Sequence, residues 1–505
     1  MVNIDRQVEA AAKLVRQGDY FCINRGRQYG KTTTLAALKR KLEGEGYVVF
    51  SISFEGLGEN EFLGLEQLLF ATIQKFNDCI EWAKDFRLSN NAVEQIKALE
   101  VDNSGKAAVN ALSFARTIAR ISKTEPLVLL IDEVDQAGNY PSFLRFLGVL
   151  REMYLSRSER PTFQSVILAG VYDVKNLKLK IRTEDDHQYN SAWNIAVPYK
   201  EDMFLSAKGI AAMLEEYMKD HQLDFDCQLL GQMIFDYTSG YPFLVSRICQ
   251  IIDEEAYSWD KDGVLKATHD LLIERNTLFD DMIKKLDQYQ ELKELLKSIL
   301  FEGKTRTFYI DEKYLQIGLM FNFLKNNNGS VAIACRLMET RLYNMFIGEE
   351  ETTAIFSQGQ IDKSQFIHDG RIDMRRLIER FSIHFNQIYR PGNDDKFVED
   401  NGRKIFLTYL RPIINGVGNY YCEAQTRDLT RTDIIIDYLG QQYIIELKIW
   451  HGQSYNERGE KQLAEYLDYY HLHTGFMVSF CFNKGKQPGI KEVIIGDKKL
   501  IEAIV

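Results

Sequence analysis

Residues 20–34 read YFCINRGRQYGKTTT and combine a short apolar strand, a loop with two glycines and the start of a helical pattern that runs to Leu42. Backbone N–H groups at the start of a helix attract anions, and a glycine lets the backbone approach them closely. We therefore predict a phosphate-cradling loop in which Gly30 allows that approach. Lys31 would reach the β- and γ-phosphate oxygens, and Thr32 would bind magnesium.

A second apolar segment ends in acidic residues. Residues 127–135 read LVLLIDEVD, which is the pattern of a buried parallel strand. The segment resembles a Walker B element, and this resemblance implies that Asp132 holds the magnesium ion through water and that Glu133 orients the attacking water. The alternative is a core strand capped by exposed acids, but residues 25–32 supply the other half of a nucleotide site and favour the first interpretation.

Together these segments resemble the Walker A and Walker B elements of P-loop NTPases. Arg25 replaces the first glycine of G-x-x-x-x-G-K-[ST], and the loop is similar to the R-x-R-R-F-G-K-S loop of a bacterial AAA-like ATPase family. The resemblance implies ATP and Mg²⁺ as cofactors. It implies nucleotide contacts from Arg25, Gly26, Arg27, Gln28, Tyr29, Gly30, Lys31, Thr32, Thr33 and Asp132.

A helical region follows the expected ATPase core and begins with the amphipathic stretch Ala207–His221, which predicts a helix. Residues 238–244 read TSGYPFL and resemble the Gly-x-Pro start of a lid helix in archaeal-type and STAND-type ATPases. Arg247 lies on this helix, and the resemblance implies that it faces the γ-phosphate. An ordinary surface arginine explains it equally well.

Near the carboxyl end, residues 431–436 and 443–449 read RTDIII and YIIELKI and predict a hairpin, with residues 437–442 as the turn. Side chains on a strand alternate between its faces, so Glu446 and Lys448 share one face, and Asp433 can join them from the neighbouring strand. Two carboxylates beside a lysine can hold a hard divalent cation and position a water next to a phosphate. A solvated strand face is the alternative, but charges within such an apolar run are costly unless paired or metal-bound.

The hairpin resembles the core of the PD-(D/E)XK nuclease superfamily, and the likeness covers roughly residues 370–505. Glu399 falls where that superfamily often has a helical glutamate, and Gln462 and Tyr466 resemble the Q-x-x-x-Y element of its RecB-related branch. The resemblance implies that Asp433, Glu446 and Glu399 bind Mg²⁺ or Mn²⁺. It also implies that Lys448 positions the water and that Gln462 and Tyr466 orient the strand or the backbone of the site.

The whole chain predicts an α/β multidomain fold. We expect a parallel-sheet P-loop ATPase core at 1–205, a helical lid at 206–275, a winged-helix-like module at 276–350, a linker at 351–370 and a restriction-endonuclease-like domain at 371–505. The winged-helix-like module rests on two helices followed by a hairpin whose strands we expect at 320–324 and 330–334. Its recognition helix carries no basic pattern, so we favour packing over DNA reading.

Length and composition limit the class of protein. The chain has 505 residues, 45% hydrophobic and 27% charged, which suits several globular domains. Its seven cysteines are scattered, no long apolar run is present, and the first residues are unlike a signal peptide, so we expect a cytoplasmic protein that does not enter a membrane. The net charge of −10 argues mildly against a nucleic-acid coat, although the segment 371–411 carries nine basic and six acidic residues.

These patterns lead to a functional hypothesis. We expect an ATP-regulated, Mg²⁺- or Mn²⁺-dependent prokaryotic nuclease that acts on DNA, possesses ATPase activity, can form homo-oligomers and belongs to defence or mobile-element biology. One alternative is a nucleotide-switched DNA-binding or assembly protein that does not cleave. A second is a chaperone-like ATPase that remodels protein partners.

Overall fold

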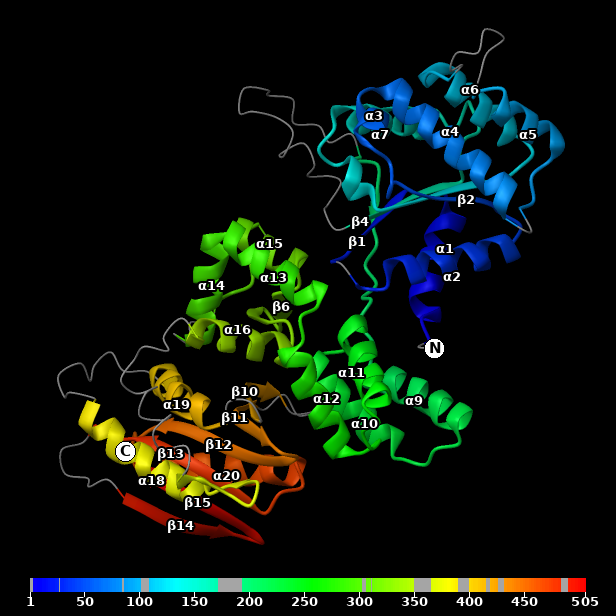
Figure 1. The fold of residues 1–505 in the computed structure, drawn as a ribbon. Coiled ribbons are helices and arrows are strands. Elements are labelled where there is room, and N and C mark those ends of the chain that lie inside the picture. The colour runs from blue at the N-terminus through cyan, green and yellow to red at the C-terminus, as the bar shows by residue number, and fades with distance from the viewer. Residues whose placement is uncertain are drawn as a thin grey trace. The chain divides into compact units, whose positions relative to one another are not determined.

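The structure is a computed structural model that describes residues 3–26, 28–83, 86–100, 109–170, 193–301, 306–309, 311–348, 365–388, 399–414, 418–425, 431–482 and 489–505. The chain forms two compact units, a first unit at Asn3–Met203 and a second unit at Phe204–Val505. Figure 1 traces both from blue to red. The predicted division of the chain into five segments stays a prediction.

The first unit is built on a parallel sheet, which confirms the α/β expectation for the amino-terminal part. Its described strands are ordered β2-β3-β4-β1-β5, and every pairing between them is parallel. The sheet lies between α1 and α2 on one face and α4 to α7 on the other (Figure 1). The elements are α1 Asp5–Gln17, β1 Phe21–Asn24, α2 Lys31–Gly44, β2 Val48–Ser53, α3 Glu59–Phe62, α4 Leu65–Trp82, α5 Asn90–Lys97, α6 Ala111–Ile121, β3 Leu127–Asp132, α7 Pro141–Leu155, β4 Ser165–Gly170 and β5 Val197–Pro198.

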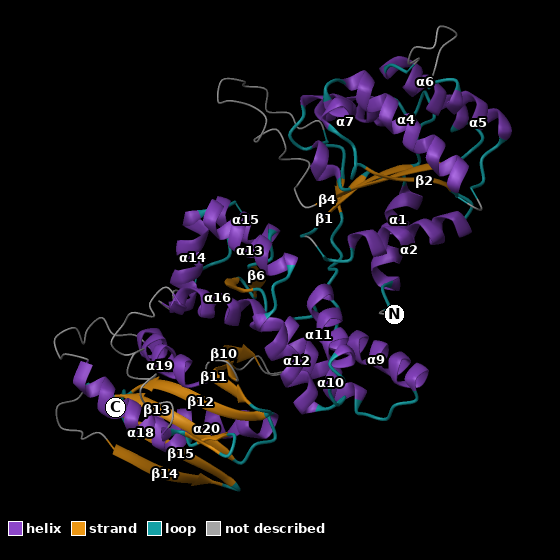
Figure 2. Ribbon diagram, viewed as in Figure 1, coloured by secondary structure: helices purple, strands orange, loops and turns teal. Residues whose placement is uncertain are grey.

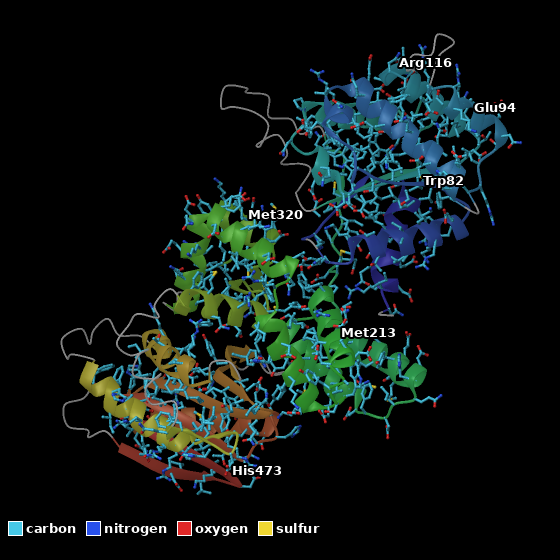
Figure 3. All side chains as sticks on the ribbon, viewed as in Figure 1. Trp82, Glu94, Arg116, Met213, Met320 and His473 are labelled. Carbon is cyan, nitrogen blue, oxygen red and sulfur yellow. The ribbon has the colours of Figure 1, made fainter. Side chains whose placement is uncertain are left out.

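The apolar run of β3 explains its central place. Leu127 to Ile131 are all fully buried, because helices cover both faces of a parallel sheet. Side chains fill the interior of the unit, while Trp82, the last residue of α4, is 75% exposed (Figure 3). The strand therefore delivers Asp132 to the carboxyl edge of the sheet with little freedom to move.

The second unit begins with helices. The predicted lid contains α9 Ala207–His221, α10 Cys227–Thr238, α11 Pro242–Glu254 and α12 Lys261–Ile273, and the helix expected at 207–221 is confirmed. The next elements are α13 Thr277–Gln288, α14 Gln290–Phe301, α15 Lys313–Met320, β6 Leu324–Asn327, β7 Ser330–Ile333 and α16 Arg336–Gly348. The first hairpin strand was expected at 320–324. That prediction was wrong, because α15 and a turn occupy Lys313–Phe323 and the strand starts at Leu324.

The carboxyl-terminal part is a mixed sheet with helices packed on it (Figure 2). Its strand order is β10-β11-β12-β13-β15-β14, with β13 parallel to β12 and to β15 and the other pairings antiparallel. The elements are β8 Ile367–His368, β9 Arg371–Ile372, α18 Met374–Ile388, α19 Glu399–Ile414, β10 Gly418–Gln425, β11 Arg431–Tyr438, β12 Gln441–Ile449, α20 Gln453–Tyr469, β13 Thr474–Phe480, β14 Gly489–Ile495 and β15 Lys498–Ile504.

The predicted hairpin between β11 and β12 is confirmed, but its turn is shorter than expected. The ladder continues to the pair Tyr438 and Gln441, and the chain reverses at Leu439 and Gly440, both of which have positive φ. The assignment of residues 437–442 to the turn was therefore wrong. Asp437 and Gln442 face each other as a strand pair, and Asp437 is buried.

Candidate functional sites

The phosphate loop connects β1 to α2 and is held by its own backbone. Gly30 has φ +76° and directly precedes α2, where its carbonyl accepts a hydrogen bond from the N–H of Thr34 at 2.9 Å. A residue with a side chain would be strained in this left-handed conformation, which explains the glycine. Lys31 is buried, and its Nζ donates to the carbonyls of Arg25 and Gly26 at 3.0 and 2.8 Å. The ammonium group thus lies across the loop, where its positive charge would attract a phosphate group.

Arg25, which stands where the usual phosphate-loop motif has its first glycine, has a structural role. Its guanidinium donates to the carbonyls of Asn24 at 2.9 Å and Glu201 at 2.8 Å, and its backbone N–H donates to the carbonyl of Gly170 at 3.1 Å. Arg25 therefore ties the loop to β4 and to the segment after β5. Its predicted nucleotide contact stays a prediction.

The remaining loop residues differ in their surroundings. Gln28 also has positive φ, Gly26 and Tyr29 are buried, and Thr33 is exposed. Arg27 lies outside the described residues.

The second half of the nucleotide site meets the first directly. The hydroxyl of Thr32 donates to Asp132 Oδ2 at 2.7 Å, although the two residues are 100 positions apart. A hydroxyl and a carboxylate are oxygen ligands that Mg²⁺ accepts, so the pair fits this cation. Glu133 follows with φ +53°, and its N–H donates to Asp132 Oδ1 at 2.9 Å. Burial raises the pKa of Glu133, while the nearby Lys31 opposes that shift.

The acidic set of the second unit, Asp433, Glu446 and Lys448, comes together on β11 and β12. Ile434 pairs with Ile445, so Asp433 stands opposite Glu446, and both side chains are buried. Lys448 Nζ lies 2.8 Å from Glu446 Oε1. Asp433 Oδ2 accepts the backbone N–H of Leu447 at 2.7 Å. The set is therefore a buried charged group on an apolar sheet, and the alternative of a solvated strand face is wrong.

Arg403 is a member of this site that the sequence did not identify. It lies on α19, is buried, and its Nη2 donates to Asp433 Oδ1 at 3.2 Å. Nothing in the sequence connects Arg403 with Asp433, because the pairing depends on how α19 packs against the sheet. Glu399 is the first residue of the same helix, and its side chain lies outside the described part of the structure.

Helix α20 covers the face that carries Glu446 and Lys448. A Cβ atom at Gly459 would lie 3.3 Å from the sulfur of Met477 and 3.5 Å from the side chain of Lys448, so α20 passes directly over both side chains. Gln462 Nε2 donates to the hydroxyl of Tyr466 at 2.5 Å. Burial raises the pKa of Tyr466 to about 12, and the nearby carboxylates of Glu446 and Asp433 add to the increase. The structure thus brings Gln462 and Tyr466 to the acidic set.

The donor set is compatible with a divalent cation. Each carboxylate oxygen has two lone pairs, and the hydrogen bonds from Arg403 and Leu447 use one on each oxygen of Asp433. Asp433 therefore keeps lone pairs that can bind a metal ion, and it lies opposite the second buried carboxylate, Glu446. Within the described residues, no three side chains of His, Cys, Asp or Glu are grouped to hold a metal ion.

Arg247 is held by acidic side chains of the lid. Its guanidinium makes hydrogen bonds to Glu274 at 2.7 and 3.0 Å and to Glu254 at 2.9 Å. This pairing explains the residue as part of lid packing, and its predicted contact with the γ-phosphate stays a prediction. Arg375, in the basic segment, is likewise paired with Glu379 and Glu492.

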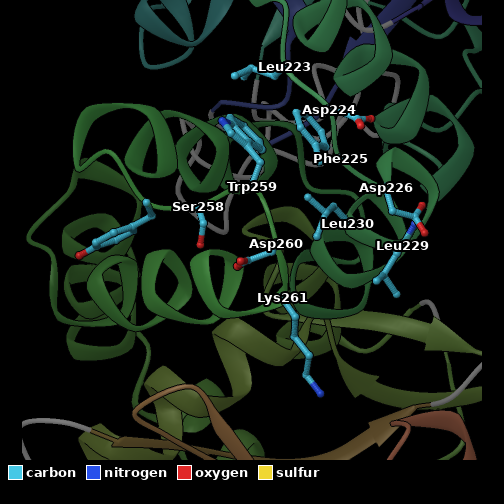
Figure 4. A pocket seen from close by; sticks show the side chains of 11 residues that line it. Leu223, Asp224, Phe225, Asp226, Leu229, Leu230, Ser258, Trp259, Asp260 and Lys261 are labelled. Atoms are coloured by element: carbon cyan, nitrogen blue, oxygen red, sulfur yellow. The ribbon is translucent and has the colours of Figure 1, made fainter.

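A cavity of about 620 Å³ lies in the lid (Figure 4). The rings of Phe225 and Trp259 stack in its lining at 5.1 Å. Asp226 and Asp260 also line it, and they accept the N–H groups of Leu229 and Gly263, each at 2.9 Å, as caps of α10 and α12. These acids therefore stabilise helix starts, and the lining contains no residue predicted for either site.

The nucleotide loop, the acidic strand end and the parallel sheet define a P-loop ATPase. The model of a protein family described as "AAA-like domain" matches residues 2–344, and the chain belongs to that family. No curated protein matches the sequence. The match ends before the acidic set, so the resemblance of residues 371–505 to nucleases stays a prediction.

Solved structures with a similar fold have low sequence identity. The Walker-type ATPase PABY2304 of Pyrococcus abyssi is 13% identical, with 68% of this chain and 96% of that chain covered and a TM-score of 0.46. The Aeropyrum pernix ORC2 protein (ADPNP–ADP complexes) is 12% identical, with 69% and 94% covered and a TM-score of 0.34. The Aeropyrum pernix ORC1 protein in complex with DNA is 11% identical, with 69% and 94% covered and a TM-score of 0.32. All three TM-scores are below 0.5, so the assignment rests on the family match and on the chain's own geometry.

In the part of the chain that the structure describes, no helix combines the length and the apolar character needed to cross a bilayer.

Proposed function

We propose that the protein is an ATP-regulated nuclease that uses Mg²⁺ or Mn²⁺ and acts on DNA. The observation that carries the proposal is the acidic set itself, because Asp433 and Glu446 are buried opposite each other with Lys448 Nζ 2.8 Å from Glu446. Burying ionised groups is costly without strong compensation, so their retention in an otherwise apolar sheet favours a functional role.

The roles follow from the chemistry of each group. Asp433 and Glu446 would hold the cation, with Glu399 as a further ligand. When bound, the cation would polarise the phosphate and lower the pKa of a bound water. Lys448 would orient that water and stabilise negative charge that develops on the phosphate oxygens. Tyr466 and Gln462, joined by their hydrogen bond, would position the nucleic-acid strand or the backbone beside it.

The ATPase module would supply the control. Lys31 and the loop N–H groups would bind the phosphates, Thr32 and Asp132 would hold Mg²⁺, and Glu133 would orient the water that attacks the γ-phosphate. Arg247 would contact the nucleotide from the lid. Lys31→Ala is expected to abolish ATP binding, measured by calorimetry, because the buried ammonium group and its charge are lost together. Unchanged affinity would remove the phosphate-loop assignment.

The nuclease proposal is tested by incubating double-stranded DNA, single-stranded DNA and RNA with Mg²⁺ or Mn²⁺, with and without ATP. Wild type is expected to cleave DNA. Asp433→Ala and Asp433→Asn are expected to reduce cleavage by about 100-fold or more, since removal of a catalytic group typically has effects of that size. The asparagine variant keeps hydrogen-bond acceptance from Leu447 and so guards against a folding defect. Glu465→Gln, an exposed change on α20, is the matched control and is expected to leave cleavage unchanged. Equal behaviour of wild type and both Asp433 variants on every substrate contradicts the proposal.

One observation favours a second function, that of a nucleotide-switched DNA-binding or assembly protein. Arg403 and Lys448 pair with Asp433 and Glu446, so the four charges balance one another. A domain that binds nucleic acid without cutting it could use this balanced arrangement. In that case the Asp433 variants would bind DNA like wild type, and no substrate would be cleaved.

A further inference from the structure

A buried polar and aromatic cluster joins the predicted lid to the carboxyl-terminal sheet. We call it the lid junction and define it as Asp236, Tyr237, Arg336, Tyr421, Asp437, Tyr469 and Tyr470. Its members come from α10, α16, β10, β11 and the end of α20, which are far apart in sequence but belong to the same compact unit.

Among the described residues, three hydrogen bonds join members of the lid junction to one another. The hydroxyl of Tyr237 donates to Asp437 Oδ2 at 2.8 Å. The hydroxyl of Tyr469 donates to Asp236 Oδ2 at 2.9 Å. Arg336 Nη2 donates to the hydroxyl of Tyr470 at 3.2 Å. Each of these bonds connects two modules, and two of them connect lid helix α10 with the sheet or with α20. The hydroxyl of Tyr237 also accepts a hydrogen bond from Gln442 Nε2 on β12 at 3.3 Å, which is a further link between α10 and the sheet.

Aromatic contacts and burial make the lid junction rigid. The rings of Tyr237 and Tyr421 lie 4.9 Å apart, and the Arg336 guanidinium lies 4.8 Å from the centre of the Tyr237 ring. Tyr237, Arg336 and Asp437 are each less than 10% exposed. Surface ion pairs rearrange at little cost, whereas a buried hydrogen-bonded charge must keep its partner. A movement of α10 is therefore expected to move the groups bonded to it.

Two elements of the lid junction, β11 and α20, also reach the acidic set. Asp433 and Asp437 are four residues apart on β11, so they share a face and lie about 13 Å apart at the strand rise of about 3.3 Å per residue. On α20, Tyr466 lies close enough to Glu446 and Asp433 for their charges to raise its pKa, and Tyr469 lies one turn further along, at the lid junction. The turn after β11 also packs on α12, because a Cβ atom at Gly440 would overlap the carboxylate of Asp262.

We propose that the lid junction transmits the nucleotide state of the ATPase module to the acidic set through β11 and α20. This inference rests on the proposed function, in which ATP regulates the nuclease, and it names the residues that carry the regulation. Tyr237 and Tyr469 are positioning residues, since they act through Asp437 and α20 and do not touch the acidic set.

The test uses Tyr237→Phe and Tyr469→Phe in the full-length protein. Each variant removes one hydroxyl that links modules and keeps the ring in place. The matched control is Tyr257→Phe, because the Tyr257 hydroxyl donates to Asp270 Oδ2 at 2.7 Å within the lid alone. The readouts are ATP affinity, cleavage rate with and without ATP, and hydrogen exchange of peptides from 207–273 and from 431–470.

In wild type and in Tyr257→Phe, ATP is expected to change exchange in both sets of peptides and to change the cleavage rate. In Tyr237→Phe and Tyr469→Phe, ATP affinity and ATP-free cleavage are expected to stay within about twofold. The ratio of cleavage rates with and without ATP falls to about one, and the exchange response of residues 431–470 disappears while that of 207–273 remains.

The exchange measurement separates the two proposals. If wild type cleaves nothing but the junction variants still lose the response at 431–470, the nuclease proposal fails and the lid junction stands. If ATP leaves residues 431–470 of wild type unchanged, or if both junction variants respond like wild type, the lid junction proposal is refuted.

Discussion

Replacing Gly240 by alanine tests how the lid is fastened at its start. Gly240 has φ +76°, and a Cβ atom there would overlap the carbonyl oxygen of Leu205. The N–H of Leu205 in turn donates to the carbonyl of Gly240 at 2.8 Å. The left-handed conformation costs an L-residue about 1–2 kcal/mol. Moving the backbone of Leu205 away from Gly240 would relieve the overlap. It would also leave buried backbone groups without partners, which costs about 1–3 kcal/mol. The free energy of opening this region is therefore expected to fall by about 2–5 kcal/mol.

Gly329→Ala is the matched control. Gly329 has φ +88°, but a Cβ atom there meets nothing within 4 Å, so only the backbone term of about 1–2 kcal/mol applies. Native-state hydrogen exchange is the appropriate assay, because a chain with two compact units does not give one global unfolding free energy. Peptides from α10 and α11 report on Gly240, and peptides from β6 and β7 report on Gly329. Equal losses at the two glycines would refute the steric argument.

Three further predictions concern the two sites. Glu133→Gln is expected to bind ATP within about twofold of wild type while its turnover, measured by phosphate release, falls by about 100-fold or more, and rapid turnover would contradict the assigned role. Chelation of divalent cations by EDTA is expected to abolish DNA cleavage, with recovery on addition of Mn²⁺, and cleavage that persists in EDTA would exclude a metal-dependent reaction. Arg403→Gln is expected to strengthen Mn²⁺ binding in the absence of nucleic acid by about tenfold or more, measured by calorimetry, because a cation beside Asp433 is removed, and unchanged affinity would show that Arg403 does not compete with the metal.

The sequence predicted a helix or strand well where the residue pattern of one continuous segment is enough to determine it. The apolar run Leu127–Ile131 becomes β3, and the amphipathic stretch Ala207–His221 becomes α9 with those bounds. The sequence also assigned Thr32 and Asp132 to one magnesium site, and the structure joins these two side chains by a hydrogen bond. In each case the physical cause is short-range periodicity or backbone geometry, which a single sequence displays.

Other features depend on partners that are distant in sequence. Asp437 looks like a turn residue because Gly440 and two glutamines follow it closely, yet it is a buried strand residue bonded to Tyr237, 200 positions earlier. Arg403 offers no local sign that it will pair with Asp433. Burial and charge pairing are properties of the packed chain, so the lid junction and the arginine of the acidic set were found only in the structure.

The charges of the acidic set indicate how metal and nucleic acid would bind. Among the described side chains, the formal charges of Asp433 and Glu446 are matched by those of Arg403 and Lys448, so the group is neutral as it stands. Even with Glu399 as a further ligand, a divalent cation alone would leave an excess of one positive charge in this poorly solvated place, which is costly. A phosphodiester brings negative charge to the same place and reduces that cost. Each ligand should therefore increase the affinity of the other by the same factor, as linkage requires. The acidic set would bind its cation weakly in the absence of nucleic acid and tightly when a phosphate is present, which confines the reactive arrangement to the substrate complex.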